Sequence, residues 1–399
     1  MDQPRPLMQT LRRELRSREQ EIVRLLGKFV RCESPSHSKA AVDRFGRMVA
    51  REWRRRGAKV RLLRQTKRGD HVRAELWLGD GCPTGQILIL GHLDTVYPLG
   101  TLPAMPFRVS GGRACGPGIF DMKAGIALAL FAVDALKEVS SGLPKSAHGA
   151  PARFLGKRLV FFWNSDEEIG SDTSRREMER EACRSDAVLV LEPSFGLEGK
   201  LKTARKGVGT AEIIVTGRSA HAGLDPAAGV NAVHELALQI ARLMKMNNPR
   251  RGITVQATVI AGGTVSNVVP AHACAHVDIR YARVSDAPGL DRKLRSLRPI
   301  LPGAQLEVLG GVNRPPLERT AAVGQLLRRA QSLMGELNLP LGEVSVGGGS
   351  DGNFTAALGV PTLDGLGAVG GGAHSPSEHV IIRDLPTRAA LIAGLLASL

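Results

Sequence analysis

Residues 87–98 read ILILGHLDTVYP, and they carry more structural information than any other stretch of the chain. The apolar run predicts a buried strand that ends at Gly91, with His92 and Asp94 directly after it. Polar groups at the C-terminal end of a strand in an α/β sheet commonly build a site. Since residues two apart on a strand share a face, Asp94 can orient a metal-ligating His92 imidazole. A polar loop with a capping aspartate is the alternative interpretation.

Strands and helices alternate on both sides of this stretch, which predicts an α/β fold with a largely parallel sheet. Residues 139–156 are rich in Ser, Gly, Pro and Ala and predict a surface loop. The predicted helices and strands before residue 204 are helices 7–30, 39–56 and 125–139, and strands 74–79, 87–92, 158–165 and 186–193.

The pattern changes near residue 204 to a βαββαβ order, which is the ferredoxin-like α+β unit. Its predicted elements are strand 207–217, helix 227–246, strands 252–262 and 272–282, helix 287–300 and strand 304–312. Alternation then resumes with helix 320–337, a glycine-rich loop at 347–352, strand 361–366 and helix 384–398. We therefore expect one α/β domain made of residues 1–204 and 316–399, interrupted by an α+β domain at 205–315.

Composition excludes several classes of protein. Of the 399 residues, 43% are hydrophobic and 23% charged, which is ordinary for a globular fold and excludes a disordered or collagen-like chain. The net charge of +16 permits a nucleic-acid partner, but the basic residues are scattered and only 4% of residues are aromatic. The five cysteines form no CxxC pair, and neither a signal-like N-terminus nor a membrane-length apolar run is present. We expect a soluble, cytoplasmic protein without nucleic-acid or membrane partners.

Carboxylates recur at three further positions where the predicted structure changes. Asp121 lies in GPGIFDMKAG, Glu167 and Glu168 in FFWNSDEEIGS after an apolar strand, and Glu192 in VLVLEPS at the end of another. Adjacent carboxylates repel one another unless a cation compensates. The alternatives are a helix cap for Asp121, an acidic first helical turn for the glutamates at 167 and 168, and a solvated strand end for Glu192.

A glycine run in GGGAHSPSEH, residues 370–379, adds His374, which is otherwise an ordinary loop histidine. Together, the strand ends and loops supply His, Asp, Glu, Glu and His without cysteine. Such nitrogen and oxygen donors suit one or two Zn²⁺ ions, with Mn²⁺ or Co²⁺ as substitutes. An odd carboxylate between two histidine–glutamate sets can bridge two metals about 3.5–4 Å apart.

Taken in order, GHLDTV, GxxDMKxG, DEExGS, LEP and AHSPSE resemble the zinc-dependent aminoacylase and carboxypeptidase family over nearly the whole chain. This family includes glutamate carboxypeptidase, acetylornithine deacetylase, succinyl-diaminopimelate desuccinylase and peptidase T. The resemblance implies a zinc-hydrolase domain, two Zn²⁺ per chain, and an inserted lid that forms a homodimer. It implies that Asp121 bridges two sites, with Glu167 as general base, Asp94 orienting His92, and ligands His92, Asp121 and Glu192 on one zinc and Asp121, Glu168 and His374 on the other.

The resemblance also implies that the lid completes a substrate pocket. GRSAHAG places His221, which would help hold the oxyanion, while a strand-end histidine is the alternative. An arginine fork suits a substrate carboxylate, and a glycine loop offers amides to an anion. For Asn267 the alternative is a turn-forming asparagine, and for Arg280 it is a surface arginine on a strand. The candidate substrate contacts are His221, Asn267, Arg280, Arg314, Gly349 and Ser350.

Within the family, GHLDTVYPLGTL, ACGPGIFDMKAG, DIRYARVSD and NRPPLE are most similar to the glutamate carboxypeptidase subgroup. This similarity implies hydrolysis of an amide to release a C-terminal glutamate, from folate or N-acyl-glutamate substrates that are small molecules or short peptides with a free carboxylate. A deacylase of N-acyl amino acids is the alternative. The chain departs from the subgroup in lacking a signal and in reading DMKAG where DMKGG is commoner.

Overall fold

The computed structural model describes residues 6–79, 82–141 and 156–399, and these residues form two compact units. Unit 1 comprises Met1–Thr203, Arg319–Val344 and Ser350–Leu399, and unit 2 comprises Ala204–Glu318 and Ser345–Gly349. The division predicted from sequence differs by a few residues and assigns 345–349 to the larger domain. In the structure, Arg205 donates to the carbonyls of Gly348 and Gly349, which groups this loop with unit 2.

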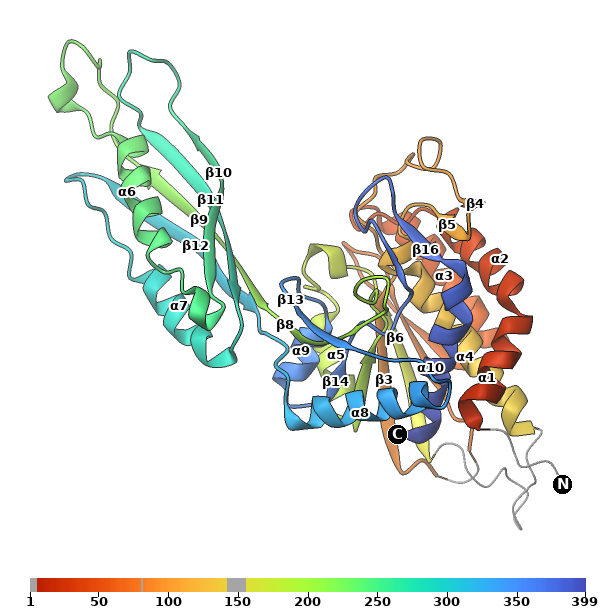
Figure 1. The fold of residues 1–399 in the computed structure, drawn as a ribbon. Helices are drawn as coiled ribbons and strands as arrows, with labels where there is room; N and C mark the ends of the chain where they lie inside the picture. The colour runs from red at the N-terminus through yellow and green to blue at the C-terminus, as the bar shows by residue number, and fades with distance from the viewer. Residues whose placement is uncertain (1–5, 80–81, 142–155) are drawn as a thin grey trace. The chain divides into compact units, whose positions relative to one another are not determined.

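Unit 1 contains a six-stranded sheet with helices on both faces (Figure 1). The strands of this sheet are β1 (Lys59–Leu63), β2 (His71–Leu76), β3 (Gly85–His92), β6 (Lys157–Asn164), β7 (Ala187–Val190) and β14 (Thr362–Leu363). The helices are α1 (Leu7–Ser17), α2 (Glu19–Val30), α3 (Lys39–Arg55), α4 (Ala124–Ser141), α5 (Arg175–Ala182), α8 (Ala321–Gly335), α9 (Gly352–Ala357) and α10 (Leu385–Ser398).

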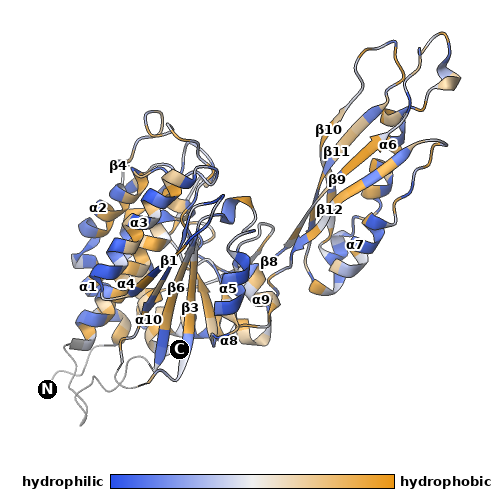
Figure 2. Cartoon of the chain, turned by 180° about the vertical axis from the view of Figure 1, so that it is seen from behind, coloured by the Kyte–Doolittle hydropathy of each residue, from blue (hydrophilic) through white to orange (hydrophobic). Residues whose placement is uncertain are grey.

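The strand order is β1-β2-β6-β3-β7-β14, and the last four strands of this order run parallel. Alternate residues of β3, such as Ile87 and Leu88, belong to two different apolar cores, one on each face of the sheet. Helices α1–α4, α8 and α10 cover one face, and α5 and α9 cover the other. Burial on both faces explains why β3 and β6 are hydrophobic along most of their length (Figure 2).

The described residues also form two smaller sheets, in addition to the six-stranded sheet and the main sheet of unit 2. One is built from β4 (Arg108–Ser110), β5 (Arg113–Cys115), β15 (Gly370–Gly371) and β16 (His379–Ile381). The other pairs β8 (Leu201–Arg205) with β13 (Glu343–Val346). The first of these sheets joins the segments before Asp121 and after His374, because β16 pairs with β5.

Unit 2 is an antiparallel sheet with two helices on one face. Its strands lie in the order β10-β11-β9-β12, which is the ferredoxin-like order expected from βαββαβ. The apolar residues of β9 and β11 alternate with polar ones, and the buried set packs on the helices. Its elements are β9 (Gly207–Thr216), α6 (Ala232–Met244), β10 (Thr254–Gly262), β11 (His272–Tyr281), α7 (Ala287–Arg295) and β12 (Gln305–Arg314).

The predicted α/β fold with a mostly parallel sheet and a separate α+β unit is confirmed. Strand 74–79 is corrected to β2, which begins three residues earlier because His71 and Arg73 are buried polar residues with partners. Strand 361–366 is corrected to the two residues of β14. Most of the loop predicted at 139–156 lies outside the described residues. Among the described helices, none is long and apolar enough to cross a bilayer.

Candidate metal centre

The imidazole of His92 lies at the C-terminal end of β3, and its side chain is only 1% exposed. The preceding residue is glycine because a Cβ at position 91 would lie 2.5 Å from the Met122 side chain and 2.8 Å from the Trp163 ring. The His92 Nδ1 atom lies 3.0 Å from the backbone carbonyl of Asp94 and 3.5 Å from its carboxylate. The ring is therefore oriented by Asp94, and Nε2 points into the site.

Asp121 lies between the two histidines. Its Oδ1 is 3.2 Å from His92 Nε2, and its Oδ2 is 3.3 Å from His374 Nε2. The residue belongs to the short segment Ile119–Lys123 before α4, where its φ of −116° and ψ of 95° are not helical. A helix cap therefore does not describe it, because its carboxylate faces two imidazoles rather than backbone amides.

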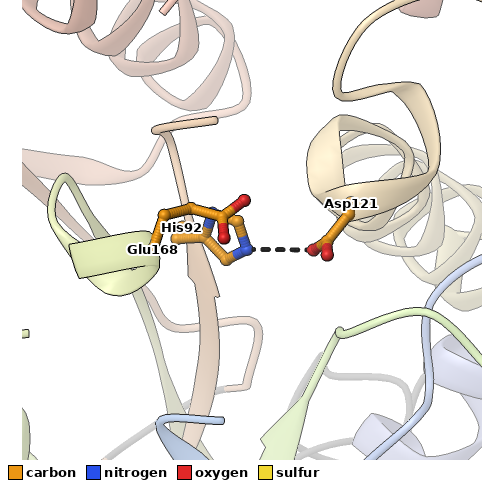
Figure 3. Close-up of side chains that lie close together, drawn as sticks. All are labelled: His92, Asp121 and Glu168. Atoms are coloured by element: carbon orange, nitrogen blue, oxygen red, sulfur yellow. Dashed lines mark hydrogen bonds and ion pairs between the residues drawn. The ribbon is translucent and has the colours of Figure 1, made fainter. Parts of the chain in front are cut away.

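Each histidine has one further carboxylate beside it. Glu192, two residues after the end of β7, places Oε1 3.5 Å from His92 Nε2, and Glu168 places Oε2 3.2 Å from His374 Nε2. Figure 3 shows His92, Asp121 and Glu168 converging from separate segments. Among the described residues, these three offer ligand atoms that all lie within 4.8 Å of one another. Each of the five residues predicted from the sequence as metal ligands therefore lies beside at least one other of the five.

The turn that carries Glu167 and Glu168 is held by Asp94. The two Asp94 carboxylate oxygens accept hydrogen bonds from the backbone amides of Glu167 and Glu168, each at 3.3 Å, and the Ser36 hydroxyl donates to one of them at 2.7 Å. Asp94 is therefore shared between orienting His92 and fixing this turn. The second role was not anticipated, because nothing in the spacing of residues 94 and 167 indicates that they meet.

His374 adopts a left-handed backbone with φ of 60°, two residues after the glycine run 370–372. This conformation costs a residue with a side chain about 1–3 kcal/mol and survives where surrounding contacts enforce it. Two such contacts are the Ser375 amide and hydroxyl, which both donate to the Gly372 carbonyl. The strained loop places the half-exposed His374 ring opposite Asp121.

The electrostatics of the cluster favour a cation. Burial lowers the pKa of His92, but the carboxylates of Asp121, Asp94 and Glu192 outweigh burial and raise that pKa well above its usual value. Hydrogen bonds to Asp121 and Glu168 raise the pKa of His374 to about 10. Burial of Asp121 opposes ionisation, yet the two histidines hold its pKa well below the usual range. Positive charge is therefore strongly stabilised between these carboxylates.

Two observations indicate that this cation is a metal. Within the part of the chain that the structure describes, buried Glu168 Oε1 has no hydrogen-bond partner, although such an atom normally has one. Moreover, ligands held about 2.1 Å from a tetrahedral zinc lie about 3.4 Å apart. The four separations between imidazole nitrogens and carboxylate oxygens are 3.2, 3.5, 3.3 and 3.2 Å. The residues present fit a metal bound by nitrogen and oxygen ligands.

Most of the predicted substrate contacts lie in unit 2. His221 and Asn267 are exposed and adjacent, since the Ala222 amide donates to the Asn267 carbonyl. The Arg280 guanidinium makes a bidentate ion pair with Asp278 rather than presenting an open fork. The other predicted contacts are Arg314 and Gly349, which pack together, and buried Ser350, whose hydroxyl donates to Asp364 at 2.6 Å. The substrate roles of these six residues stay predictions.

One buried residue beside the cluster was not predicted from the sequence. Glu378 is fully buried, and its carboxylate accepts hydrogen bonds from the backbone amides around Asp121. It lies four residues after His374 in the quoted segment GGGAHSPSEH. Its spacing from the histidine was the available signal, but a glutamate on a polar loop is usually solvated.

Comparison with known proteins places the chain among peptidases. Residues 203–298 match the model of the peptidase dimerisation domain. The chain is 32% identical over 384 residues to carboxypeptidase G2 from Pseudomonas sp. (strain RS-16), covering 95% of this chain and 89% of that protein. The chain belongs to the M20 peptidase family. As an M20 family member it is a metal-dependent hydrolase that acts on amide bonds.

Other M20 relatives extend the comparison. Succinyl-diaminopimelate desuccinylase from Xanthomonas oryzae pv. oryzae is 28% identical over 342 residues, covering 81% of this chain and 86% of its own. An aminopeptidase structure from Bacillus cereus has a TM-score of 0.75 at 20% identity, covering 95% and 98% of the two chains. A dinuclear metal binding M20 peptidase from Bacillus subtilis has a TM-score of 0.67 at 15% identity, with 96% and 98% covered. These two structures share the fold of this chain. The family resemblance in the motifs is confirmed by the carboxypeptidase G2 and dimerisation-domain matches.

Proposed function

We propose that the chain is a dizinc carboxypeptidase that hydrolyses an amide bond to release a C-terminal amino acid, with glutamate preferred. The substrates are small molecules or short peptides with a free carboxylate, of the folate or N-acyl-glutamate type. The preference for glutamate rests on the similarity of GHLDTVYPLGTL and NRPPLE to the glutamate carboxypeptidase subgroup. The carboxypeptidase G2 similarity supports the release of a C-terminal residue.

One observation carries the proposal that two metals bind. The two oxygens of Asp121 face two different histidines, and each histidine has its own glutamate. A single-metal site has no use for a carboxylate directed both ways, whereas a two-metal site uses one as the bridge. The M20 relative from Bacillus subtilis that is described as dinuclear supports the same assignment. Zn²⁺ is the ion we assign, with Mn²⁺ or Co²⁺ as substitutes.

When bound, two such ions supply Lewis-acid polarisation of the substrate carbonyl and activation of the attacking water. Glu167 takes a proton from that water as its oxygen adds to the carbonyl carbon. It then delivers the proton to the nitrogen of the leaving amine as the C–N bond breaks. Asp94 fixes the position of Glu167 by accepting a hydrogen bond from its backbone amide.

The His221 ring has one nitrogen available to hold an oxyanion. Its Nδ1 accepts hydrogen bonds from the amides of Gly223 and Leu224, each at 3.1 Å. Nε2 is therefore the ring nitrogen that remains to donate a hydrogen bond. We propose that this donor holds the developing oxyanion, in the active site of the partner subunit of a homodimer.

The experiment that tests the metal assignment measures metal content and hydrolysis together. We expect about two Zn²⁺ per chain in the unaltered protein and loss of both in Asp121→Asn, because a single bridging carboxylate serves both ions. Glu198→Gln, an exposed surface carboxylate paired with Lys200, is the matched control and keeps both ions. One ion per chain, or full activity after complete chelation, contradicts the proposal.

The choice between carboxypeptidase and deacylase is tested on the substrate's carboxylate. Capping it as an amide should cost about 2–4 kcal/mol of transition-state binding, as for a lost charged hydrogen bond. Arg280→Ala should remove much of this difference, with Arg283→Ala on the following loop as control. Because Arg280 is already paired with Asp278, Arg314→Ala is needed as a second variant. Equal cleavage of free and capped substrates favours the deacylase, which the desuccinylase relatives support.

A further inference from the structure

Glu378 is a buried carboxylate whose hydrogen-bonding capacity is fully used. Its Oε1 accepts the backbone amides of Phe120 at 2.7 Å and Asp121 at 2.9 Å. Its Oε2 accepts the amide of Gly118 at 3.0 Å and the hydroxyl of Tyr97 at 2.5 Å. The residue is 0% exposed, so these four donors replace the water that would otherwise surround the charge.

Three segments that carry candidate metal ligands meet at this carboxylate. Tyr97 lies on the loop that follows His92 at the end of β3, and its hydroxyl oxygen also lies 3.0 Å from the Ser375 carbonyl oxygen. Asp121 is held through its own amide, and Glu378 itself follows His374 by four residues. The amide of Gly116 adds a backbone contact to the Glu378 carbonyl at 3.3 Å.

We propose that Glu378 is the positioning residue of the metal centre, which fixes the bridging Asp121 relative to His374 and His92 without touching the metals. The proposal rests on the two-metal function proposed above. A carboxylate is the side chain suited to this place, because it accepts at both oxygens and carries no donor. In Glu378→Gln, one oxygen becomes an NH₂ group that faces backbone or hydroxyl donors. The segment around Asp121 must then move.

The test measures zinc affinity by competition with a fluorescent zinc chelator at fixed pH, separately from activity. Loss of a group that orients metal ligands typically weakens metal affinity or activity about 10–100-fold. We expect Glu378→Gln to weaken zinc binding at least about 10-fold. We also expect saturating zinc to restore most of kcat, because Glu167 and all five ligands remain.

A matched control separates positioning from general stability. Glu235 on α6 is also 0% exposed and accepts the backbone amides of Ile300 and Leu301 together with the Gln239 side chain. It belongs to unit 2, whereas every candidate metal ligand belongs to unit 1. Glu235→Gln should therefore lower the unfolding temperature as Glu378→Gln does, yet leave zinc affinity unchanged. Equal zinc affinity in Glu378→Gln and the unaltered protein overturns the proposal.

Tyr97→Phe keeps the proposal testable if Glu378→Gln does not fold. This variant removes one of the four donors to Glu378, and we expect a several-fold weaker zinc affinity. Unchanged zinc affinity in Tyr97→Phe together with an unfolded Glu378→Gln overturns the proposal. Failure of the proposed function can be distinguished from failure of this proposal. If the protein binds two zinc ions but does not cleave N-acyl glutamates, the substrate assignment is wrong. The comparison of zinc affinities still decides the role of Glu378.

Discussion

Glu167 begins the short helical turn Glu167–Ile169, and its backbone amide donates a hydrogen bond to Asp94. The carboxylate of its neighbour Glu168 lies 3.2 Å from His374 Nε2. Under the proposed function, these adjacent glutamates would have different roles, with Glu167 accepting a proton and Glu168 binding a metal.

We predict that Glu167→Gln retains two zinc ions and the folded structure but loses turnover about 10²–10⁴-fold, the usual cost of losing a general base. Metal analysis and kcat on an N-acyl glutamate measure the two effects. Glu168→Gln is the comparison, since it should lose metal as well as activity. If the activity of Glu167→Gln instead falls in proportion to its zinc content, Glu167 is a ligand.

Asp70 joins two elements of unit 1, and its carboxylate is almost fully buried. It pairs with Lys39 of α3 at 2.7 Å and with Arg64 after β1 at 2.8 Å, and it accepts the Gln65 amide. Burial raises the pKa of Asp70, but these partners outweigh burial and hold the pKa below its usual range. Ionised Asp70 therefore stabilises the junction between α3 and the β1–β2 hairpin.

The sign of this pKa shift predicts a pH dependence. The stabilisation by Asp70 is fully present above its unfolded pKa of about 3.9 and is lost as the pH falls through the lower folded value. We expect Asp70→Asn to reduce the free energy of unfolding by about 1–3 kcal/mol at pH 7, with a smaller difference near pH 3. Urea unfolding at both pH values measures the difference. Exposed Asp172→Asn is the control, and a difference that grows on acidification refutes the prediction.

The long elements were predictable because their patterns are strong. Strands such as β3 and β6 are continuous apolar runs, and the βαββαβ order of unit 2 follows from the succession of strand-like and helix-like segments alone. The edge strand β1 was missed, since KVRLL is exposed or half-buried throughout. The strands of the small sheet, two or three residues long, were missed because so short a segment has no periodicity.

The candidate ligands were predictable for a different reason. Glu192 lies two residues beyond a strand, and His92 ends one, so their positions at one edge of the sheet follow from topology. Asp94 and Glu378 act on distant backbone amides, and no local pattern reports which amides these are. Likewise, Arg280 pairs with Asp278, two residues away on the same strand face. The prediction that Arg280 offers an open fork to a substrate did not take this neighbour into account.

At the scale of the whole molecule, the edge of unit 2 indicates a partner. Strand β10 ends the sheet order, and Val259 and Ile260 on it are 54% and 60% exposed. An exposed apolar edge strand is normally covered. Together with the match to the peptidase dimerisation domain, this favours a symmetric homodimer in which β10 lies beside its copy.

We predict that Ile260→Lys converts the proposed dimer into a monomer, because it places a charge on the exposed apolar edge strand that the partner copy would cover. Sedimentation at micromolar concentration measures the mass. Val284→Lys, an exposed apolar position elsewhere in unit 2, is the control and should remain dimeric. His221→Ala should lose turnover while keeping zinc and the dimer. A fully active monomer refutes the shared site.

The insertion of unit 2 has a consequence for how the chain is made. Strand β7 ends at Val190, but β14, which pairs with it, begins at Thr362. At about 5–20 residues per second, the ribosome needs on the order of 10–30 s to reach β14. During that interval the apolar β7 presents an unpaired edge, and α10 is not yet present to cover α4. The nascent chain is thus open to aggregation for longer than an uninterrupted α/β domain.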